Sequence, residues 1–289
     1  MPDPAVTFET LGANGLDFDV RRAGPPDGPL VMLLHGFPQT GASWRESLPA
    51  LARAGYHAVA PDQRGYSPGA QPHRVGDYTV DALGADVIGL ADALGADRFH
   101  LVGHDWGGAV GWHLAARQPE RLLSFTSVST PHPRAMAAAM AGTQALRSLY
   151  IPFFRLPWLP ERVLGAGHHR VLREGLVRSG LPRERATETV EALERSGALP
   201  WALAWYRANG PRLVRSTGPV AVPTMYVWST GDTALGRSGA ERTAGHVTGP
   251  YRFEVLEGVS HWIPETAADA LNRLLVDHLA DVEAGGPPP

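Results

Sequence analysis

The feature that most constrains the fold of this chain is the hexapeptide Gly103-His104-Asp105-Trp106-Gly107-Gly108. It follows an apolar run at 99–102 that predicts a buried strand, and it leads into residues 109–116, which predict a helix. A strand that turns this sharply into a helix needs small residues near the apex, because side chains there would collide with the turn. The apex residue, Asp105, then stands at the carboxyl end of the strand, where α/β sheets place their chemistry. The pattern predicts a nucleophile elbow in which aspartate replaces the usual serine.

An aspartate at this apex limits the chemistry that the site can perform. A carboxylate is ionised at neutral pH and needs no base to become a nucleophile. Its attack on a carbonyl would give an easily reversed anhydride, so the productive electrophile is an sp³ carbon with a good leaving group. We therefore expect Asp105 to attack an epoxide or an alkyl halide.

Strand-like and helix-like segments alternate along most of the chain, and this indicates a mostly parallel sheet with helices on both faces. The first two strand-like runs alternate in polarity, as in a hairpin at a sheet edge. Helices are expected at 44–54 and 80–94, and the strand-like runs are 6–10, 16–22, 30–34, 57–60, 99–102, 122–128, 222–229 and 251–256. The sequence predicts an α/β fold with a mostly parallel eight-stranded sheet flanked by helices.

One segment departs from this alternation. Residues 133–215 are rich in Ala, Leu, Arg and Pro and show helical periodicity without a convincing strand. An all-helical block between two α/β blocks predicts an inserted cap over the carboxyl edge of the sheet. We therefore expect a core domain formed by 1–132 and 216–289 and a helical cap domain at 133–215, with a disordered tail at 284–289.

Composition excludes several classes of function. The 289 residues carry a net charge of −3, so we expect neither a nucleic acid nor a membrane as a partner. The chain has no cysteine, and it shows neither a signal-peptide pattern at its start nor a long apolar run, so we expect a cytoplasmic protein. We find no phosphate-binding or dinucleotide fingerprint and no histidine or carboxylate spacing typical of zinc, and we expect no cofactor and no metal.

Two further residues complete the chemistry that Asp105 requires. An alkyl ester on Asp105 must be hydrolysed, and His261 follows the last predicted strand in a loop before the closing helix, where this architecture places its histidine base. A histidine base needs an acid to fix its tautomer, and Asp232 follows the strand-like run at 222–229. An Asx turn or a helix cap is the alternative role for Asp232.

Two backbone N–H groups are candidates for an oxyanion hole. Phe37 lies in the loop after the first central strand, and Trp106 directly follows the nucleophile. Loops at these two places supply the oxyanion donors on this fold. The N–H groups of Phe37 and Trp106 would then stabilise the tetrahedral oxyanion that forms when water attacks the ester of Asp105.

The sequence resembles the α/β-hydrolase-fold epoxide hydrolases from its first strands to its closing helix. The motifs that carry the resemblance are His35-Gly36-Phe37-Pro38, Asp62-Gln63-Arg64-Gly65-Tyr66-Ser67, the elbow, Trp205-Tyr206-Arg207 and Ser260-His261-Trp262. The resemblance implies a two-step reaction without a cofactor, whose reactants are a small-molecule epoxide and water. Asp105 would open the ring, and water activated by His261 would release a vicinal diol.

In this family two cap tyrosines protonate the opening epoxide. Tyr206 matches the second of them. Where the family has the first tyrosine, the aromatic pattern at 150–157 puts Phe153, so Tyr206 acts alone or Tyr150 or a cap indole supplies the second donor. The residues expected to bind substrate are Phe37, Trp106, Phe153, Trp158 and Trp205, although Trp205 would alternatively pack on the core.

Two other functions are weighed against this one. A haloalkane or haloacid dehalogenase would use the same Asp105, Asp232 and His261. Phe37 stands where haloalkane dehalogenases commonly have a halide-binding asparagine, and Trp106 stands where haloacid dehalogenases have an arginine. A catalytically silent homologue that binds an apolar ligand is the third reading, and the intact set of three polar residues argues against it.

Overall fold

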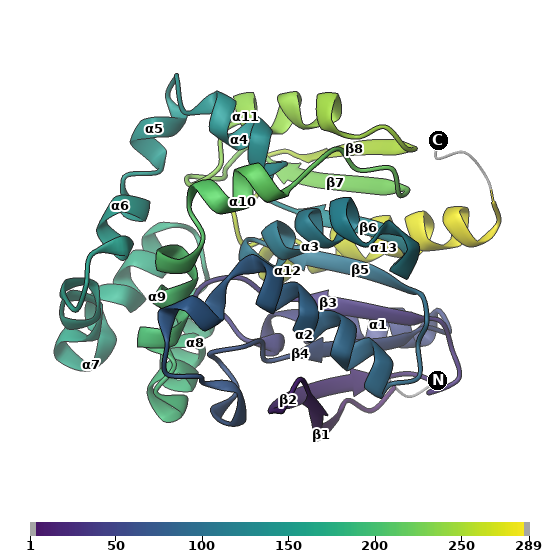
Figure 1. Cartoon of the computed structure of the whole chain (residues 1–289), viewed down its shortest axis with the longest axis horizontal. Helices are drawn as coiled ribbons and strands as arrows, with labels where there is room; N and C mark the ends of the chain where they lie inside the picture. Colours follow the sequence, from purple (N-terminus) through teal and green to yellow (C-terminus); the bar gives the residue numbers. More distant parts are fainter. Residues whose placement is uncertain (1–3, 286–289) are drawn as a thin grey trace.

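The computed structural model describes residues 4–285, which form one twisted sheet covered by helices, with a group of further helices at one end (Figure 1). The sheet has eight strands in the order β1-β2-β4-β3-β5-β6-β7-β8. In chain order they are β1 (Thr7–Ala13), β2 (Leu16–Ala23), β3 (Leu30–Leu34), β4 (His57–Pro61), β5 (Phe99–His104), β6 (Leu122–Val128), β7 (Thr224–Ser229) and β8 (Tyr251–Leu256). This confirms the predicted α/β-hydrolase fold with a mostly parallel eight-stranded sheet.

Only the first hairpin interrupts the parallel arrangement of the described strands. β1 pairs antiparallel with β2, and β2 pairs antiparallel with β4, whereas β4, β3, β5, β6, β7 and β8 run parallel. The hairpin turns at Asn14 and Gly15, whose φ angles are 52° and 73°. Positive φ at both positions suits the two-residue turns whose twist matches that of the strands. The turn extends β1 to Ala13, beyond the predicted end at residue 10.

The central strand β3 shows how the sheet is buried on both faces. Met32 and Leu34 pack in the core cluster that includes residues of α2 (Val80–Ala93) and α3 (Trp106–Arg117). Val31 and Leu33 point to the other face, against residues of α1 (Ser47–Arg53) and α13 (Ala268–Glu283). A continuous apolar run is what a parallel strand covered on both faces requires.

The helix expected at 44–54 is shorter than predicted. A 3₁₀ turn spans Gly41–Trp44, where the Thr40 hydroxyl accepts a hydrogen bond from the backbone N–H of Ala42, and α1 begins only at Ser47. Two further helices lie near the carboxyl end of the chain, α11 (Arg237–Arg242) and α12 (Ile263–Thr266).

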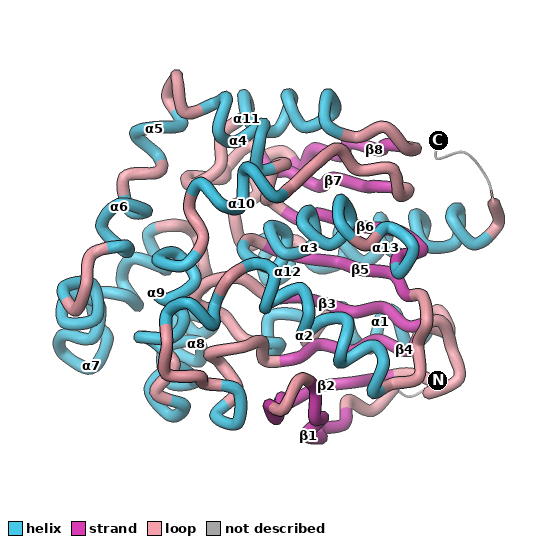
Figure 2. Tube along the Cα trace, viewed as in Figure 1, coloured by secondary structure: helices cyan, strands magenta, loops and turns pink. Residues whose placement is uncertain are grey.

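Between β6 and β7 the chain forms helices and no strand, as predicted for 133–215 (Figure 2). We refer to these helices as the cap: α4 (Pro133–Ala139), α5 (Gln144–Arg147), α6 (Tyr150–Arg155), α7 (Leu159–Arg178), α8 (Arg183–Ser196), α9 (Leu199–Ala208) and α10 (Pro211–Ser216). The backbone of α7 is interrupted between Ala166 and His169, where three residues have positive φ. The cap lies mostly at the carboxyl end of the parallel strands (Figure 1).

Two remaining expectations concern membranes and the tail. No helix within residues 4–285 is long and apolar enough to cross a membrane. The part of the predicted disordered tail at 286–289 lies outside the described residues, while α13 extends to Glu283.

Candidate active site

Asp105 lies at the apex between β5 and α3 in a backbone conformation that few residues adopt. Its φ and ψ are 51° and −118°, a conformation that costs free energy for any residue other than glycine. A Cβ atom on Gly103 would collide with the backbone oxygen of Gly107, and one on Gly107 would collide with that of Leu34. The turn therefore closes only because glycines flank it, as the sequence pattern predicts.

The Asp105 carboxylate is held by backbone donors. Its Oδ1 accepts a hydrogen bond of 2.8 Å from the Phe37 N–H, and the Trp106 N–H also hydrogen-bonds the carboxylate. Gly36 permits this approach, because a Cβ there would overlap the Asp105 side chain. Burial acts to raise the pKa of Asp105, but His261 and the Trp106 N–H outweigh it, so the pKa lies below its usual value. Asp105 is ionised at neutral pH.

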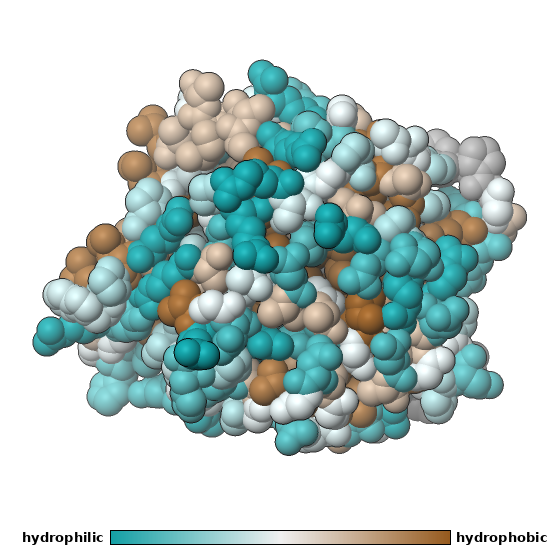
Figure 3. Space-filling model, in the orientation of Figure 1, coloured by the Kyte–Doolittle hydropathy of each residue, from teal (hydrophilic) through white to brown (hydrophobic). Residues whose placement is uncertain are grey.

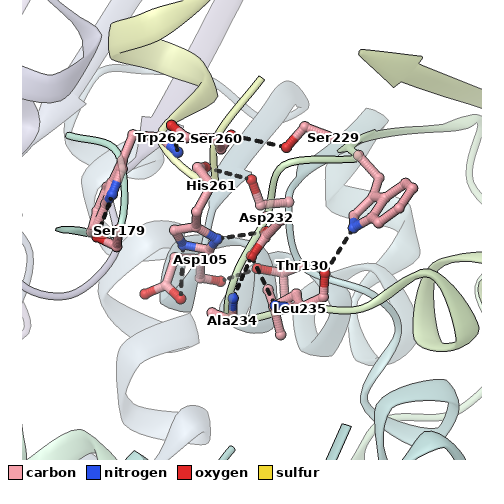
Figure 4. Close-up of polar contacts among 12 residues, drawn as sticks. Asp105, Thr130, Ser179, Ser229, Asp232, Ala234, Leu235, Ser260, His261 and Trp262 are labelled. Carbon is pink, nitrogen blue, oxygen red and sulfur yellow. Dashed lines mark hydrogen bonds and ion pairs between the residues drawn. The ribbon is translucent and has the colours of Figure 1, made fainter. Parts of the chain in front are cut away.

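The imidazole of His261 lies between two carboxylates (Figure 4). Its Nδ1 is 2.7 Å from Oδ2 of Asp232, and its Nε2 is 3.6 Å from Oδ2 of Asp105. The other oxygen of Asp232 accepts hydrogen bonds from the N–H groups of Ala234 (2.7 Å) and Leu235 (2.8 Å). Asp232 therefore both accepts the hydrogen bonds of the turn after β7 and faces the histidine.

The charge on His261 follows from these neighbours. Burial acts to lower the pKa of His261, but the carboxylates of Asp232 and Asp105 outweigh it and raise the pKa to about 10. His261 is 4% exposed, which limits screening by water. At neutral pH the resting site therefore holds an imidazolium between two carboxylates.

Four side chains that the sequence analysis did not single out hydrogen-bond the backbone oxygens of Asp105, Asp232 or His261. Ser129 Oγ and His104 Nε2 hydrogen-bond the backbone oxygen of His261, at 2.8 and 3.0 Å. The Thr130 hydroxyl donates to the backbone oxygen of Asp105 at 2.7 Å. Arg147 of α5 donates to the backbone oxygen of Asp232 at 2.6 Å. Ser129 and Thr130 directly follow β6, and that position at a strand's carboxyl end is the signal that could have identified them.

Two tyrosines from the cap face Asp105. Tyr206 of α9 packs edge-to-face on Trp106, with ring centroids 5.0 Å apart, and Tyr150 of α6 lies 6.2 Å from Tyr206 between centroids. Both tyrosines line the cavities that reach Asp105. Burial, with a contribution from the charge of Asp105, raises the pKa of both phenols above the ordinary value. Each hydroxyl therefore carries its proton at neutral pH.

The aromatic residue beside these tyrosines is Phe154, not Phe153. The Phe154 ring lies 5.2 Å from that of Phe37 and 5.1 Å from that of Tyr206, and it lines a cavity, whereas Phe153 packs behind it. The expectation that Phe153 contacts substrate is corrected accordingly. Consecutive residues on a helix point about 100° apart, so a shift of one position in the sequence moves the predicted side chain away from the cavity wall.

Of the three tryptophans expected to bind substrate, Trp106 lines the larger cavity, whereas Trp158 and Trp205 line neither cavity. Trp158 is 62% exposed at the start of α7, with a φ of 52° that turns the chain outward. Trp205 is buried in the core, where its indole N–H donates to the backbone oxygen of Arg64 at 3.0 Å. For Trp205 the structure thus favours the alternative of core packing, and for Trp158 the expected role is corrected.

Two cavities meet at Asp105, Tyr150 and Tyr206. The larger has a volume of about 600 Å³ and runs between α3, α4, α6 and α10. The smaller, about 340 Å³, runs between α5, α6 and α7 and reaches Phe37 and His261. Most of the residues that line the larger cavity are apolar, among them Met136, Ile151 and Leu213. Within residues 4–285, no group of three or more histidines or carboxylates is arranged to hold a metal ion.

Comparison with known sequences supports the resemblance. The model of the alpha/beta hydrolase fold family matches residues 29–268. The AB hydrolase superfamily protein YfhM of Bacillus subtilis is 36% identical, and the match covers 95% of this chain and 98% of that protein. Epoxide hydrolase A of Mycobacterium tuberculosis is 32% identical, with coverage of 96% and 99%.

Solved structures give the same result. Epoxide hydrolase A of Mycobacterium thermoresistibile superimposes with a TM-score of 0.84 at 28% identity, and the match covers 96% of this chain and 98% of that one. The epoxide hydrolase VrEH1 of Vigna radiata gives a TM-score of 0.82 at 26% identity, with the same coverage. The chain therefore belongs to the α/β-hydrolase fold family and, within it, to the epoxide hydrolases.

Proposed function

We propose that this protein hydrolyses an epoxide to a vicinal diol in two steps, through a covalent ester on Asp105. The observation that carries the proposal is that one nucleophilic carboxylate and two protonated phenols line the same cavity walls. An epoxide needs both groups, because its leaving oxygen stays attached and must take a proton. A departing halide needs no proton, so the tyrosines favour the epoxide over the alkyl halide.

In the first step Oδ2 of Asp105 attacks a ring carbon of the epoxide. A carbon–oxygen bond to Asp105 forms as the ring carbon–oxygen bond breaks, and the electron pair of the broken bond goes to the ring oxygen. That oxygen takes a proton from the hydroxyl of Tyr206 or Tyr150. The Phe37 N–H keeps the other carboxylate oxygen, Oδ1, in place. The Trp106 N–H also hydrogen-bonds the carboxylate.

In the second step water attacks the ester carbon of Asp105 while His261 Nε2 takes a proton from the water. Esterification has removed one of the two carboxylate charges that hold the pKa of His261 at about 10, so that pKa falls. The imidazolium then loses its proton, which restores the tyrosine hydroxyl that was deprotonated in the first step, and the neutral imidazole can act as a base. The N–H groups of Phe37 and Trp106 stabilise the oxyanion. The intermediate collapses, the bond from the ester carbon to the diol oxygen breaks, and that oxygen takes the proton from His261. The second proton of the water then passes from the Asp105 carboxyl group to the imidazole, which restores the Asp105 carboxylate and the imidazolium of the resting site.

The test is the intact mass of His261→Gln after incubation with aromatic epoxides or, separately, with alkyl halides. This variant keeps the nucleophile but lacks the base, so an alkyl-enzyme should accumulate. We expect the protein to gain the mass of the whole epoxide. The double variant Asp105→Ala/His261→Gln should show no such gain in mass. A gain equal to an alkyl group without its halide would instead identify a dehalogenase. No adduct with either panel would favour a silent ligand-binding homologue.

The same background tests the tyrosines. Tyr206→Phe/His261→Gln should form the epoxide adduct about 10²- to 10⁴-fold more slowly than His261→Gln, because a general acid contributes rate enhancement of that order. In the otherwise intact enzyme, Tyr206→Phe should leave hydrolysis of the preformed ester nearly unchanged. Equal slowing of both steps would contradict the acid role and indicate a packing role for Tyr206.

A further inference from the structure

Exposed apolar side chains gather on three consecutive cap helices, α5 to α7. Leu146 is 73% exposed and Trp158 is 62% exposed, although both are residue types that proteins usually bury at least in part. We define the docking face as Leu146, Leu149, Leu156, Trp158, Val163 and Val171, all of which are exposed. Figure 3 shows brown residues along the edge of the molecule that these helices form in Figure 1. Several large apolar side chains exposed along one edge of a molecule are typical of an interaction site.

The charge of the cap is opposite to that of the core. Residues 133–215 contain thirteen arginines and six glutamates, a net charge of +7, whereas the rest of the chain carries −10. The expectation of no membrane partner used the net charge of −3, an average that conceals this separation. The docking face therefore belongs to a strongly basic part of the molecule.

The acidic residues nearest this face are already engaged. Glu161 pairs with Arg207 at 2.6 Å, and Glu174 pairs with Arg183 at 2.8 Å. Arg162 and Arg170, also on α7, are exposed, and the Arg162 guanidinium lies over the Trp158 ring, 6.0 Å from its centroid. The face thus combines leucines, a tryptophan and exposed guanidinium groups.

The docking face reaches the smaller of the two cavities that lead to Asp105. Val171 of the face lines the smaller cavity. Helix α6 separates the two cavities, since Tyr150 lines both, Ile151 and Arg155 line the larger one, and Phe154 lines the smaller. A surface that binds this face would therefore lie next to a cavity through which an apolar molecule can reach the Asp105 carboxylate.

We propose that the docking face binds the surface of an anionic lipid membrane. Apolar side chains that enter the acyl boundary, with an interfacial tryptophan and arginines that reach lipid phosphates, are the combination that holds proteins at such surfaces. A bilayer accepts leucines at any position along its surface, whereas a protein partner would need matching pockets. The proposal concerns the surface of the cap and does not depend on which bond the site cleaves.

The experiment is flotation of the full chain with vesicles of phosphatidylcholine alone or of phosphatidylcholine and phosphatidylglycerol in equal parts. We expect binding to the anionic vesicles that weakens as salt is added. Arg162→Glu/Arg170→Glu should lower the vesicle partition coefficient at least about tenfold, because each basic residue near an anionic surface contributes about one kcal/mol. Leu146→Ser/Leu149→Ser should lower it without a charge change. Arg273→Glu, an exposed arginine of α13 in the core, is the matched control and should bind like the parent.

Two results would overturn the proposal. One is a vesicle result that does not depend on the docking face: either the parent protein binds neither kind of vesicle, or the variants of the docking face bind as well as the parent. The other is a concentration-dependent dimer in sedimentation velocity that Leu146→Ser/Leu149→Ser abolishes while no vesicle is bound, which would assign the face to a second copy of the chain. Thermal melts of each variant show whether it is folded, and turnover of a water-soluble epoxide reports on the active site separately.

Discussion

At the scale of the residue, the charge on His261 controls the second step of the reaction that we propose. In the free enzyme Asp232 and Asp105 overcome the effect of burial and hold the pKa of this imidazole at about 10. The alkyl-enzyme keeps Asp232 but has lost the charge of Asp105, so burial, which favours the neutral imidazole, regains weight. The same residue is therefore an acid in the resting site and a base in the intermediate.

We predict that the rate constant of ester hydrolysis rises with pH and levels off at an apparent pKa well below 10. The sign follows from the neutral imidazole being the reactive form, since its fraction grows as pH rises to the pKa and then saturates. Single-turnover experiments, in which the decay of the alkyl-enzyme is followed by quenched mass analysis across pH, measure this directly. A rate still rising at pH 10 would mean that esterification leaves the His261 pKa unchanged, against the proposed sequence of steps.

Residue positions at strand ends could be predicted from the sequence, and positions on short helices could not. Asp105, Asp232 and His261 each follow a strand, and the carboxyl ends of parallel strands meet at one edge of the sheet, so the structure brings them together. Phe153 and Phe154 are neighbours on α6, a helix of six residues with too little periodicity to show which side faces the cavity. The pattern of apolar residues there fits either orientation.

At the scale of the element, Glu265 connects three segments that form the site. It lies on α12, four residues after His261, and accepts a 3.0 Å hydrogen bond from Gln39, two residues after Phe37. Its other oxygen lies 3.3 Å from Nε of Arg185 on cap helix α8. Burial raises the pKa of Glu265 to about 7, although Arg45 and Arg185 act to lower it. The ionised form is thus less favourable in the folded chain than in water.

We predict that Glu265→Gln gains stability relative to the parent as pH rises. Because the pKa of Glu265 in the folded chain lies above the ordinary value of 4.5, the parent loses folding free energy as pH rises through about 7. Glutamine has no proton to lose. The difference in free energy of unfolding should move by about 1 kcal/mol in favour of Glu265→Gln between pH 6 and pH 8. Urea melts at both pH values measure it. Glu241 forms an exposed ion pair with Arg237 on α11 and provides the control. Glu241→Gln should show no such trend.

These contacts between elements were beyond sequence reasoning. Gln39 and Glu265 are 226 residues apart in the chain, and only the folded sheet brings the segments that carry them together. The cap helices could be predicted as helices, because their periodicity is local. Their packing on the core depends on side chains that meet across the cavity, for which the sequence holds no periodic signal.

At the scale of the whole molecule, histidines are buried both beside the site and away from it. His35, His100, His104, His132 and His278 are each buried, and burial lowers their pKa values to between about 3 and about 4. The fold was predictable from alternating strands and helices, but nothing in the sequence distinguished these histidines from solvated ones. Together they tie the stability of the whole sheet to pH.

We predict that the protein loses stability as pH falls below about 6.5, and that His278 contributes measurably to the loss. The unfolded chain binds protons near pH 6.5 and the folded chain only near pH 4, so between these values protonation favours unfolding. Neither ring nitrogen of His278 has a hydrogen-bond partner among the described residues, and the side chain is 1% exposed on α13. The free energy of unfolding of His278→Leu, taken relative to that of the parent, should therefore be about 1–2 kcal/mol higher at pH 5 than at pH 8. Urea melts at the two pH values measure this gain, and His168→Leu, whose side chain is 92% exposed, provides the matched control with no change. An equal effect of His278→Leu at both pH values would mean that the histidine acts through packing alone and that another group drives the acid sensitivity.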